Sequence, residues 1–155
     1  MKMKSFSGFL LVTTTLLAVG CGGSGSKSAG GGGGTPAKGE EILVGEYGSL
    51  TGDKATFGVM TKKGIELATD ELNAAGGVLG KKVRVLVEDD QGKPEEAANA
   101  VQKLVNQERV VAVLGEVAST NSLSAAPICQ QGKVPMISPS STSPKVTATG
   151  AWLVR

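Results

Sequence analysis

The hydrophobic pattern of residues 41–155 changes between two periods, which predicts strands alternating with helices along the folded part of the chain. Continuous apolar runs and alternating apolar residues predict strands at 41–49, 81–90, 109–115 and 134–138, and a further strand beginning at 151–155. Val83, Val85 and Val87 fall on one side of the second of these strands because successive side chains point to opposite faces.

Apolar residues spaced three and four positions apart predict helices between these strands. One buried helical face consists of Ile65, Ala68, Leu72 and Ala75, and the glycine pair that follows ends this helix. A second helix begins at Pro94 with two glutamates in its first turn, and its inner face consists of Ala97, Val101, Leu104 and Val105. A third helix covers about 119–131 and bends near Pro127.

This alternation with short connections implies right-handed crossovers, and so predicts an α/β fold with a doubly wound parallel sheet covered on both faces. Ligands bind such sheets outside the carboxyl ends of the strands. Three loops leave those ends, at 47–52, 115–122 and 138–144, and each is rich in glycine or hydroxyl side chains. We therefore expect these three loops to meet on one rim and to form a binding site.

The second of these loops runs directly into a helix. Ser119 or Thr120, together with free backbone N–H groups, can hold a carboxylate at the positive end of that helix. The alternative is structural: Ser119 caps the helix, and the residues from Ser138 to Ser143 only form turns. The convergence of three loops favours binding, although the spacing of the residues does not identify the ligand.

The N-terminal segment has the layout of a secretory signal, because two lysines precede an apolar run from Phe9 to Val19 and small residues follow. That run is shorter than the roughly 20 residues of a membrane-spanning helix. Its end, "LAVGC", resembles a bacterial lipoprotein signal, with Ala18 where leucine is usual. The resemblance implies that residues 1–20 are removed and that Cys21 is acylated, which leaves Cys129 as an unpaired, buried small hydrophobic residue.

Residues 21–40 follow as a tether between the lipidated cysteine and the folded part. Between residues 22 and 39, nine of the eighteen residues are glycine and none has a large apolar side chain, so the segment cannot bury enough surface to fold. Without the two lysines of the signal segment, 14 basic residues face 14 acidic ones, which leaves no basic footprint for nucleic acid.

Catalytic and metal sites find little support in the residue pattern. The chain contains no histidine, no G-x-G-x-x-G after the first strand and no G-x-S-x-G elbow, and "AGGVLGKK" matches a phosphate loop only in part. The acidic run "EDDQ", residues 88–91, is either a metal or phospho-acceptor site or, as we favour, a solvated strand end. We therefore expect no enzyme, no metal and no cofactor.

From Glu41 to Arg155 the chain resembles the N-terminal lobe of periplasmic substrate-binding proteins of the branched-chain amino acid type, which have the type I periplasmic binding fold. The resemblance rests on the order and spacing of "GSLTGDKATFG", "GIELATDELNAAGGVLGKKVRVLVEDDQGKPEEAANAVQKLV", "VVAVLGEVASTNSLSAAPICQQGKVPMISPSSTSP" and "WLVR". Members of this family serve ATP-driven importers and hold their ligand between two lobes.

The resemblance also implies roles for individual residues. It places the ligand carboxylate near Ser119 and the adjoining backbone N–H groups of Ala118 and Thr120. The backbone carbonyl of Ser140 and the hydroxyl of Thr142 would face the ammonium and carboxylate groups, and Phe57 would form part of the wall around the ligand side chain. A zwitterion needs such partners because unsatisfied charges make its removal from water costly.

The implied function is that of an exported lipoprotein, anchored in a membrane, that captures an amino acid or similar polar solute such as an amide. It would deliver this ligand to an ABC permease; the alternative is a lobe that senses a ligand for a receptor or signalling system. Because the family has a second lobe, we expect this sequence to be a fragment or a truncated product that offers half of a binding site.

Overall fold

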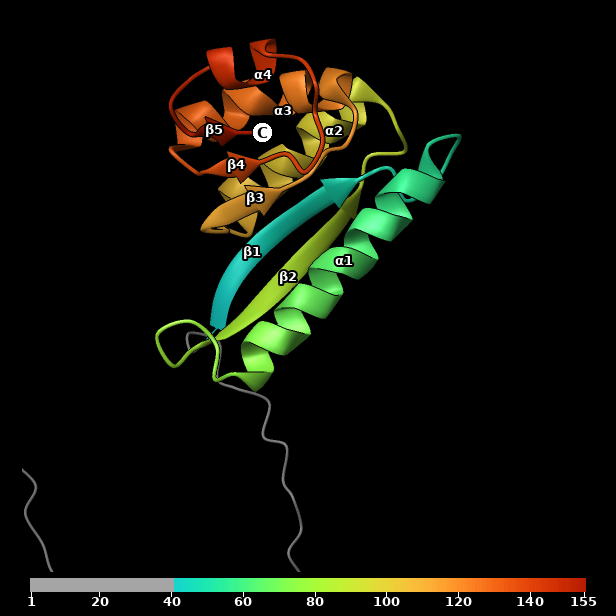
Figure 1. The fold of residues 1–155 in the computed structure, drawn as a ribbon. Helices are drawn as coiled ribbons and strands as arrows, with labels where there is room; N and C mark the ends of the chain where they lie inside the picture. The colour runs from blue at the N-terminus through green and yellow to red at the C-terminus, as the bar shows by residue number, and fades with distance from the viewer. Residues whose placement is uncertain (1–40) are drawn as a thin grey trace, which may run out of the picture. The chain divides into compact units, whose positions relative to one another are not determined.

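The computed structural model describes residues 41–155, which form one parallel sheet with helices on it (Figure 1). The strands are β1 (Glu41–Gly48), β2 (Lys82–Asp89), β3 (Ala112–Leu114), β4 (Met136–Ile137) and β5 (Leu153–Val154). They lie in the order β2-β1-β3-β4-β5, so the winding direction reverses between β1 and β3. This arrangement confirms the predicted doubly wound α/β fold and places the usual ligand position beside these two strands.

Three of the helices occur where the periodicity predicts them, and α4 is one that the sequence analysis did not predict. They are α1 (Ala55–Ala74), α2 (Pro94–Gln102), α3 (Ser119–Gly132) and the short α4 (Lys145–Ala148), and a π-helical turn, η1 (Lys103–Gln107), continues α2. The predicted strands 109–115 and 134–138 are longer than β3 and β4. Backbone hydrogen bonds such as Gly115 N to Ile137 O and Ser138 N to Val154 O nevertheless extend the pairing beyond the ends of these short strands.

Most of the core lies on the sheet face that α2, α3 and α4 cover (Figure 1). The predicted inner face of the second helix is confirmed along α2 and η1, because Ala97 and Val101 of α2 and Leu104 and Val105 of η1 are all buried. Cys129 of α3 is buried among the same residues, as predicted, and burial raises the pKa of its thiol to about 12. Small residues on both α2 and α3 allow the two helices to approach closely.

The opposite face carries only helix α1, so helices lie on both faces of the sheet, as predicted, but this face is covered less completely among the described residues. Helix α1 lies over β1 and β2 (Figure 1), and Ile137 and Val154 farther along the sheet are exposed. On α1 itself the predicted buried face is wrong, because Ala68 and Leu72 are exposed and Ile65 is only half-buried. An apolar cavity of about 340 Å³ separates this helix from the sheet.

Residues 1–40 lie outside the described part of the chain, and so do the expected signal segment, the lipidation site Cys21 and the tether. Within residues 41–155, no helix combines the length and the hydropathy that crossing a membrane requires.

Candidate ligand-binding site

The three loops that sequence analysis assigns to one rim do meet at the carboxyl edge of the sheet. The loop after β1 contacts the loop after β3 through hydrogen bonds between Ser49 and Glu116. The loop after β4 joins them because the Ser138 hydroxyl donates to the Glu116 carbonyl oxygen at 2.6 Å. A single residue, Glu116, therefore takes part in both connections.

Two glycines allow the backbone to come this close. At Gly115, φ is +108°, and a Cβ atom would lie 2.0 Å from the carbonyl oxygen of Tyr47 in β1. At Gly58, in the second turn of α1, a Cβ atom would lie 2.1 Å from the carbonyl oxygen of Ser49. Any side chain at either position would push apart the elements that form the rim.

Ser119 and Thr142, which the sequence assigns to the site, lie together. The Ser119 hydroxyl oxygen accepts hydrogen bonds from the backbone N–H groups of Thr142 at 3.1 Å and Ser143 at 3.2 Å. The alternative role as a helix cap is wrong, because Ala118 occupies the N-cap position and the Ser119 side chain makes no cap hydrogen bond. Since the hydroxyl oxygen accepts both bonds, its proton remains free to be donated.

Phe57 and Ala118 line a second part of the rim. They border an apolar cavity of about 200 Å³ together with Lys54, Glu116 and Val117. The Phe57 ring is 64% exposed, so most of its surface is available for contact with another group. The expected role of the Ala118 backbone N–H as a donor to the ligand is wrong, because this N–H donates to the Glu116 carboxylate.

The two remaining predicted residues, Thr120 and Ser140, are exposed. Thr120 lies in the first turn of α3, where backbone N–H groups have no partner inside the helix. Ser140 lies in the loop after β4, between the buried Ser138 and Ser141. No side-chain hydrogen bond joins Thr120 or Ser140 to the other predicted residues in the described part of the chain.

Beneath the rim lies a buried polar cluster that sequence analysis missed. Glu116 and Asp90 are 2% and 0% exposed, and Ser49 and Asn121 lie between or beside them. The Asp90 carboxylate accepts hydrogen bonds from the Ser49 hydroxyl at 3.1 Å, from Gly92 N at 2.8 Å and from Asn121 Nδ2 at 3.1 Å. The favoured interpretation of residues 88–91 as a solvated strand end is therefore wrong for Asp90.

Asp89, the neighbouring acid, holds the loop after β1 from its exposed side. It accepts hydrogen bonds from Leu50 N at 2.9 Å and from the Thr51 hydroxyl at 2.6 Å. Partial burial alone would raise the pKa of Asp89, but bonds from Thr51, Gln91 and Leu50 hold that pKa below its usual value. Among the described residues, no group of three acidic or cysteine side chains is arranged to hold a metal ion.

The chemistry of this rim suits a small polar ligand with an apolar part. The Ser119 hydroxyl proton and the first-turn N–H groups of α3 offer donors for a carboxylate at the positive end of a helix of 14 residues. The cavity beside Phe57 offers apolar surface a short distance away. Hydrogen-bond donors and a nearby apolar surface are the two features that a binding site for such a ligand needs.

Comparison with known proteins identifies the family. The sequence model of the family described as "Periplasmic binding protein" matches residues 41–155, and the chain belongs to this family. The family predicted from the sequence motifs is therefore confirmed, as is the type I periplasmic binding fold.

The relatives are binding proteins, which confirms that the family is not one of enzymes. An amino acid binding protein of Pseudomonas aeruginosa is 33% identical over 110 residues, which are 71% of this chain and 29% of the relative. The Leu/Ile/Val-binding protein of Escherichia coli K12 is 32% identical over 118 residues, which are 76% of this chain and 32% of the relative. This chain thus spans about a third of the length of these relatives.

Solved structures show the same fold with different ligands. The substrate binding protein LivJ of Streptococcus pneumoniae, in complex with isoleucine, has a TM-score of 0.71 and 36% identity, over 74% of this chain and 33% of that chain. A solute binding protein of Rhodopseudomonas palustris, in complex with 3,4-dihydroxybenzoic acid, has a TM-score of 0.70 and 28% identity, over 75% and 31% of the two chains.

Proposed function

We propose that this protein is an extracytoplasmic substrate-binding lipoprotein whose described lobe binds the α-carboxylate and ammonium groups of an amino acid. The observation that carries the proposal is the Ser119 hydroxyl, which two N–H groups of the loop after β4 hold at the start of α3. A hydroxyl fixed in this way has one proton left for an incoming carboxylate.

Each part of an amino acid has a partner among the residues of the rim. The carboxylate receives hydrogen bonds from the Ser119 hydroxyl, from the first-turn N–H of Thr120 and from the Thr142 hydroxyl. The ammonium group donates to the backbone carbonyl of Ser140. The apolar cavity beside Phe57 and Ala118 receives an aliphatic side chain, since it offers almost no polar surface.

The family and the N-terminal sequence support a wider role for the protein. Acylation of Cys21 anchors the exported protein to a membrane, and residues 21–40 tether the lobe to that anchor. The protein then delivers its ligand to the permease of an ABC importer. Relatives named as Leu/Ile/Val-binding proteins support a branched-chain amino acid as the ligand.

Ligand titration of the full chain, purified in detergent and followed by amide chemical shifts, tests this proposal. L-leucine, L-isoleucine and L-valine should shift the signals of residues 118–120 and 140–142. Leucinamide, which lacks the carboxylate, and 4-methylpentanoate, which lacks the ammonium group, should bind more weakly. Because a relative binds an aromatic acid, 4-hydroxybenzoate completes the panel.

A matched pair of variants on α3 sharpens the test. Ser119→Ala should raise the dissociation constant for L-leucine about 10-fold, because it removes a hydrogen bond to a charged group. Ser124→Ala removes a hydroxyl that bonds only within the same helix, at 3.3 Å from the Thr120 carbonyl oxygen, and should leave the affinity unchanged. Equal affinities in the two variants, or no shifts with any ligand, would contradict the proposed function.

A further inference from the structure

Glu116 lies at the centre of the rim, and none of its roles follows from the family or from the sequence motifs. We propose that Glu116 is a positioning residue: it does not touch the ligand but holds the three loops of the rim in the geometry that binds it. This inference rests on the proposed function, because it assigns a task to a residue beneath the same site.

The side chain of Glu116 connects the loop after β1 to the start of α3. One carboxylate oxygen accepts hydrogen bonds from Ser49 N at 3.1 Å and from the Ser49 hydroxyl at 2.7 Å. The other oxygen accepts a hydrogen bond from the backbone N–H of Ala118, the N-cap residue of α3. The carboxylate therefore fixes the backbone at Ala118, the residue directly before Ser119.

The backbone carbonyl of Glu116 connects the loop after β4 to the same point. It accepts hydrogen bonds from the hydroxyls of Ser138 at 2.6 Å, Ser122 at 3.1 Å and Ser141 at 3.3 Å. The Ser122 and Ser141 hydroxyls also lie 2.7 Å apart, so when one of them donates to the other, only the second still donates to this carbonyl, because each has a single proton. Thus one residue receives hydrogen bonds from all three rim loops, through its side chain on one side and its carbonyl on the other.

The Ser49 hydroxyl extends this connection to the loop after β2. It lies 2.7 Å from a Glu116 oxygen and 3.1 Å from an Asp90 oxygen, and its one proton can serve only one of the two at a time. Asp90 in turn accepts from Asn121 in the first turn of α3. Because Glu116, Asp90 and Ser49 are at most 2% exposed, water cannot easily replace these bonds.

This geometry assigns Glu116 an indirect effect on affinity. Its carboxylate oxygens are occupied by protein donors, so they are not free for a ligand. When the Ala118 N–H loses its acceptor, the Ser119 hydroxyl and the first-turn N–H groups occupy the binding geometry for a smaller fraction of the time. The apparent dissociation constant rises as that fraction falls.

The test compares Glu116→Gln with Glu41→Gln in the full chain. In Glu116→Gln, the side-chain NH₂ group is a hydrogen-bond donor and replaces an oxygen that accepts from either Ser49 or Ala118. Glu41 is the control because it pairs with Arg84 at the opposite end of β1. Two readouts are measured: amide hydrogen exchange without ligand, and titration with L-leucine. In Glu116→Gln, exchange of Ser49 and Ala118 should accelerate at least about 10-fold, while Val113 and Met136 in the core keep their wild-type rates.

The dissociation constant for L-leucine should rise about 10-fold in Glu116→Gln and remain at the wild-type value in Glu41→Gln. If Glu116→Gln does not fold, Ser49→Ala serves instead, with Ser124→Ala as its control, and the same two readouts should change in the same direction. Wild-type exchange rates in the rim loops, or uniformly faster exchange that includes the core, would overturn the positioning role.

The two proposals fail in different ways. If wild-type protein ignores L-leucine and the rest of the ligand panel, the proposed function is wrong, while the exchange measurement still decides whether Glu116 holds the loops. If wild-type protein binds L-leucine and Glu116→Gln binds it equally well despite faster exchange, the loops need no positioning and the inference is wrong.

Discussion

The two faces of the sheet differ in how completely the described residues cover them. On the face of α2 and α3, side chains such as Val101, Leu104 and Met136 are fully buried in one cluster. On the face of α1, the cavity of about 340 Å³ lies between helix and sheet, and large apolar side chains including Leu72 and Ile137 are exposed. The first face is thus packed like a protein core, and the second is packed loosely.

The candidate rim belongs mainly to the packed face and its edge. The serines that bond to the Glu116 carbonyl come from α3 and from the loop after β4. A binding rim needs such support, because its donors must be held in place before the ligand arrives. The rim and the core thus share their elements, whereas α1 contributes mainly its first turn, where Phe57 lies.

The largest expected effect comes from a matched pair of leucines, one on each face. Leu104→Ala should lower the free energy of unfolding by about 3 kcal/mol, because it leaves a cavity in a filled cluster. Leu72→Ala should cost about 1 kcal/mol or less, since Leu72 of α1 is 40% exposed and borders an existing cavity. Urea denaturation followed by circular dichroism measures both, and equal losses would show that the two faces are packed equally well.

The same contrast between the two faces explains why one predicted buried helix face is correct and the other is not. The spacing of Ala97, Val101 and Leu104 predicts the buried side of α2 correctly, because the partners of that side are present in the described residues. An equally regular spacing on α1 predicts burial that Ala68 and Leu72 do not have. Periodicity reveals which side of a helix is apolar, but how completely that side is covered depends on tertiary packing.

In the candidate site, too, the sequence predicts some contacts and misses others. The position of Ser119 and Thr142 after neighbouring strands predicts that they meet, because the carboxyl ends of parallel strands share one edge. Glu116 also directly follows a strand and its glycine, yet nothing local predicts that its carboxylate turns inward to Ser49 and Ala118. Such a residue is visible only once the loops are placed side by side, since its partners are far apart in sequence.

Glu46 is a buried acidic residue of β1 on the loosely packed face of the sheet. It is paired in register with Leu114 across the sheet, is 2% exposed, and one of its carboxylate oxygens has no hydrogen-bond partner among the described residues. Burial raises the pKa of Glu46 to about 7 from an ordinary value of 4.5. Burying a carboxylate without a full set of partners favours its neutral form.

The second largest effect is therefore a dependence of stability on pH. Because the pKa of Glu46 is higher in the folded state, the folded protein binds the extra proton between pH 4.5 and about 7. The contribution of Glu46 to the free energy of unfolding is most favourable below pH 4.5 and is lost as the pH rises through about 7. At 1.36 kcal/mol per pH unit, the total loss is about 3 kcal/mol.

Glu46→Gln should remove this dependence. The free energy of unfolding of Glu46→Gln should exceed that of wild type by a margin that grows by about 1 to 3 kcal/mol between pH 5 and pH 8. Glu41→Gln, at the partly exposed start of the same strand, provides the control and should keep the wild-type pH profile. Parallel profiles for wild type and Glu46→Gln across this range would show that Glu46 is not held neutral by burial.

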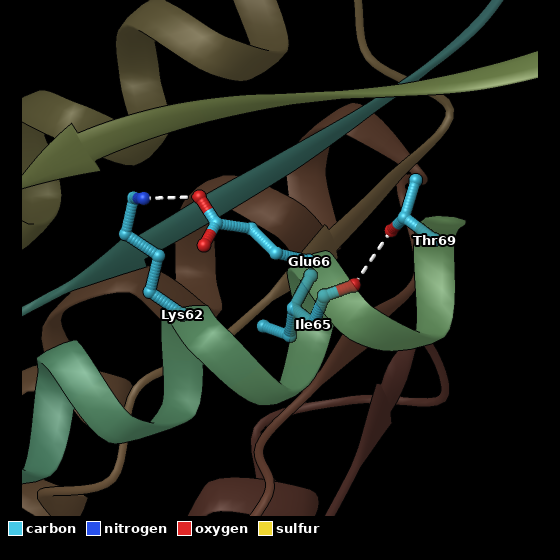
Figure 2. Close-up of polar contacts among 4 residues, drawn as sticks. All are labelled: Lys62, Ile65, Glu66 and Thr69. Carbon is cyan, nitrogen blue, oxygen red and sulfur yellow. Dashed lines mark hydrogen bonds and ion pairs between the residues drawn. The ribbon is translucent and has the colours of Figure 1, made fainter. Parts of the chain in front are cut away.

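The smallest effect concerns the ion pair on α1. Figure 2 shows Lys62 and Glu66 paired one turn apart, beside the hydrogen bond at 2.7 Å from the Thr69 hydroxyl to the Ile65 carbonyl oxygen. The positive charge of Lys62 lowers the pKa of Glu46, and the negative charge of Glu66 raises it. Both charges act on Glu46 across the loosely packed face, although neither side chain forms a hydrogen bond with Glu46 in the described part of the chain.

Removing the charge of Lys62 and removing the charge of Glu66 should shift the pKa of Glu46 in opposite directions. Lys62→Met should raise the pKa of Glu46 further, because it removes the nearby cation, whereas Glu66→Gln should lower it by removing a like charge. Carbon-13 chemical shifts of the Glu46 carboxyl group against pH measure both changes, and 1 M salt should leave them largely intact if the charges act through a poorly hydrated interior. Shifts of the same sign in both variants would mean that α1 moves relative to the sheet, and that this face lacks the fixed geometry on which the difference depends.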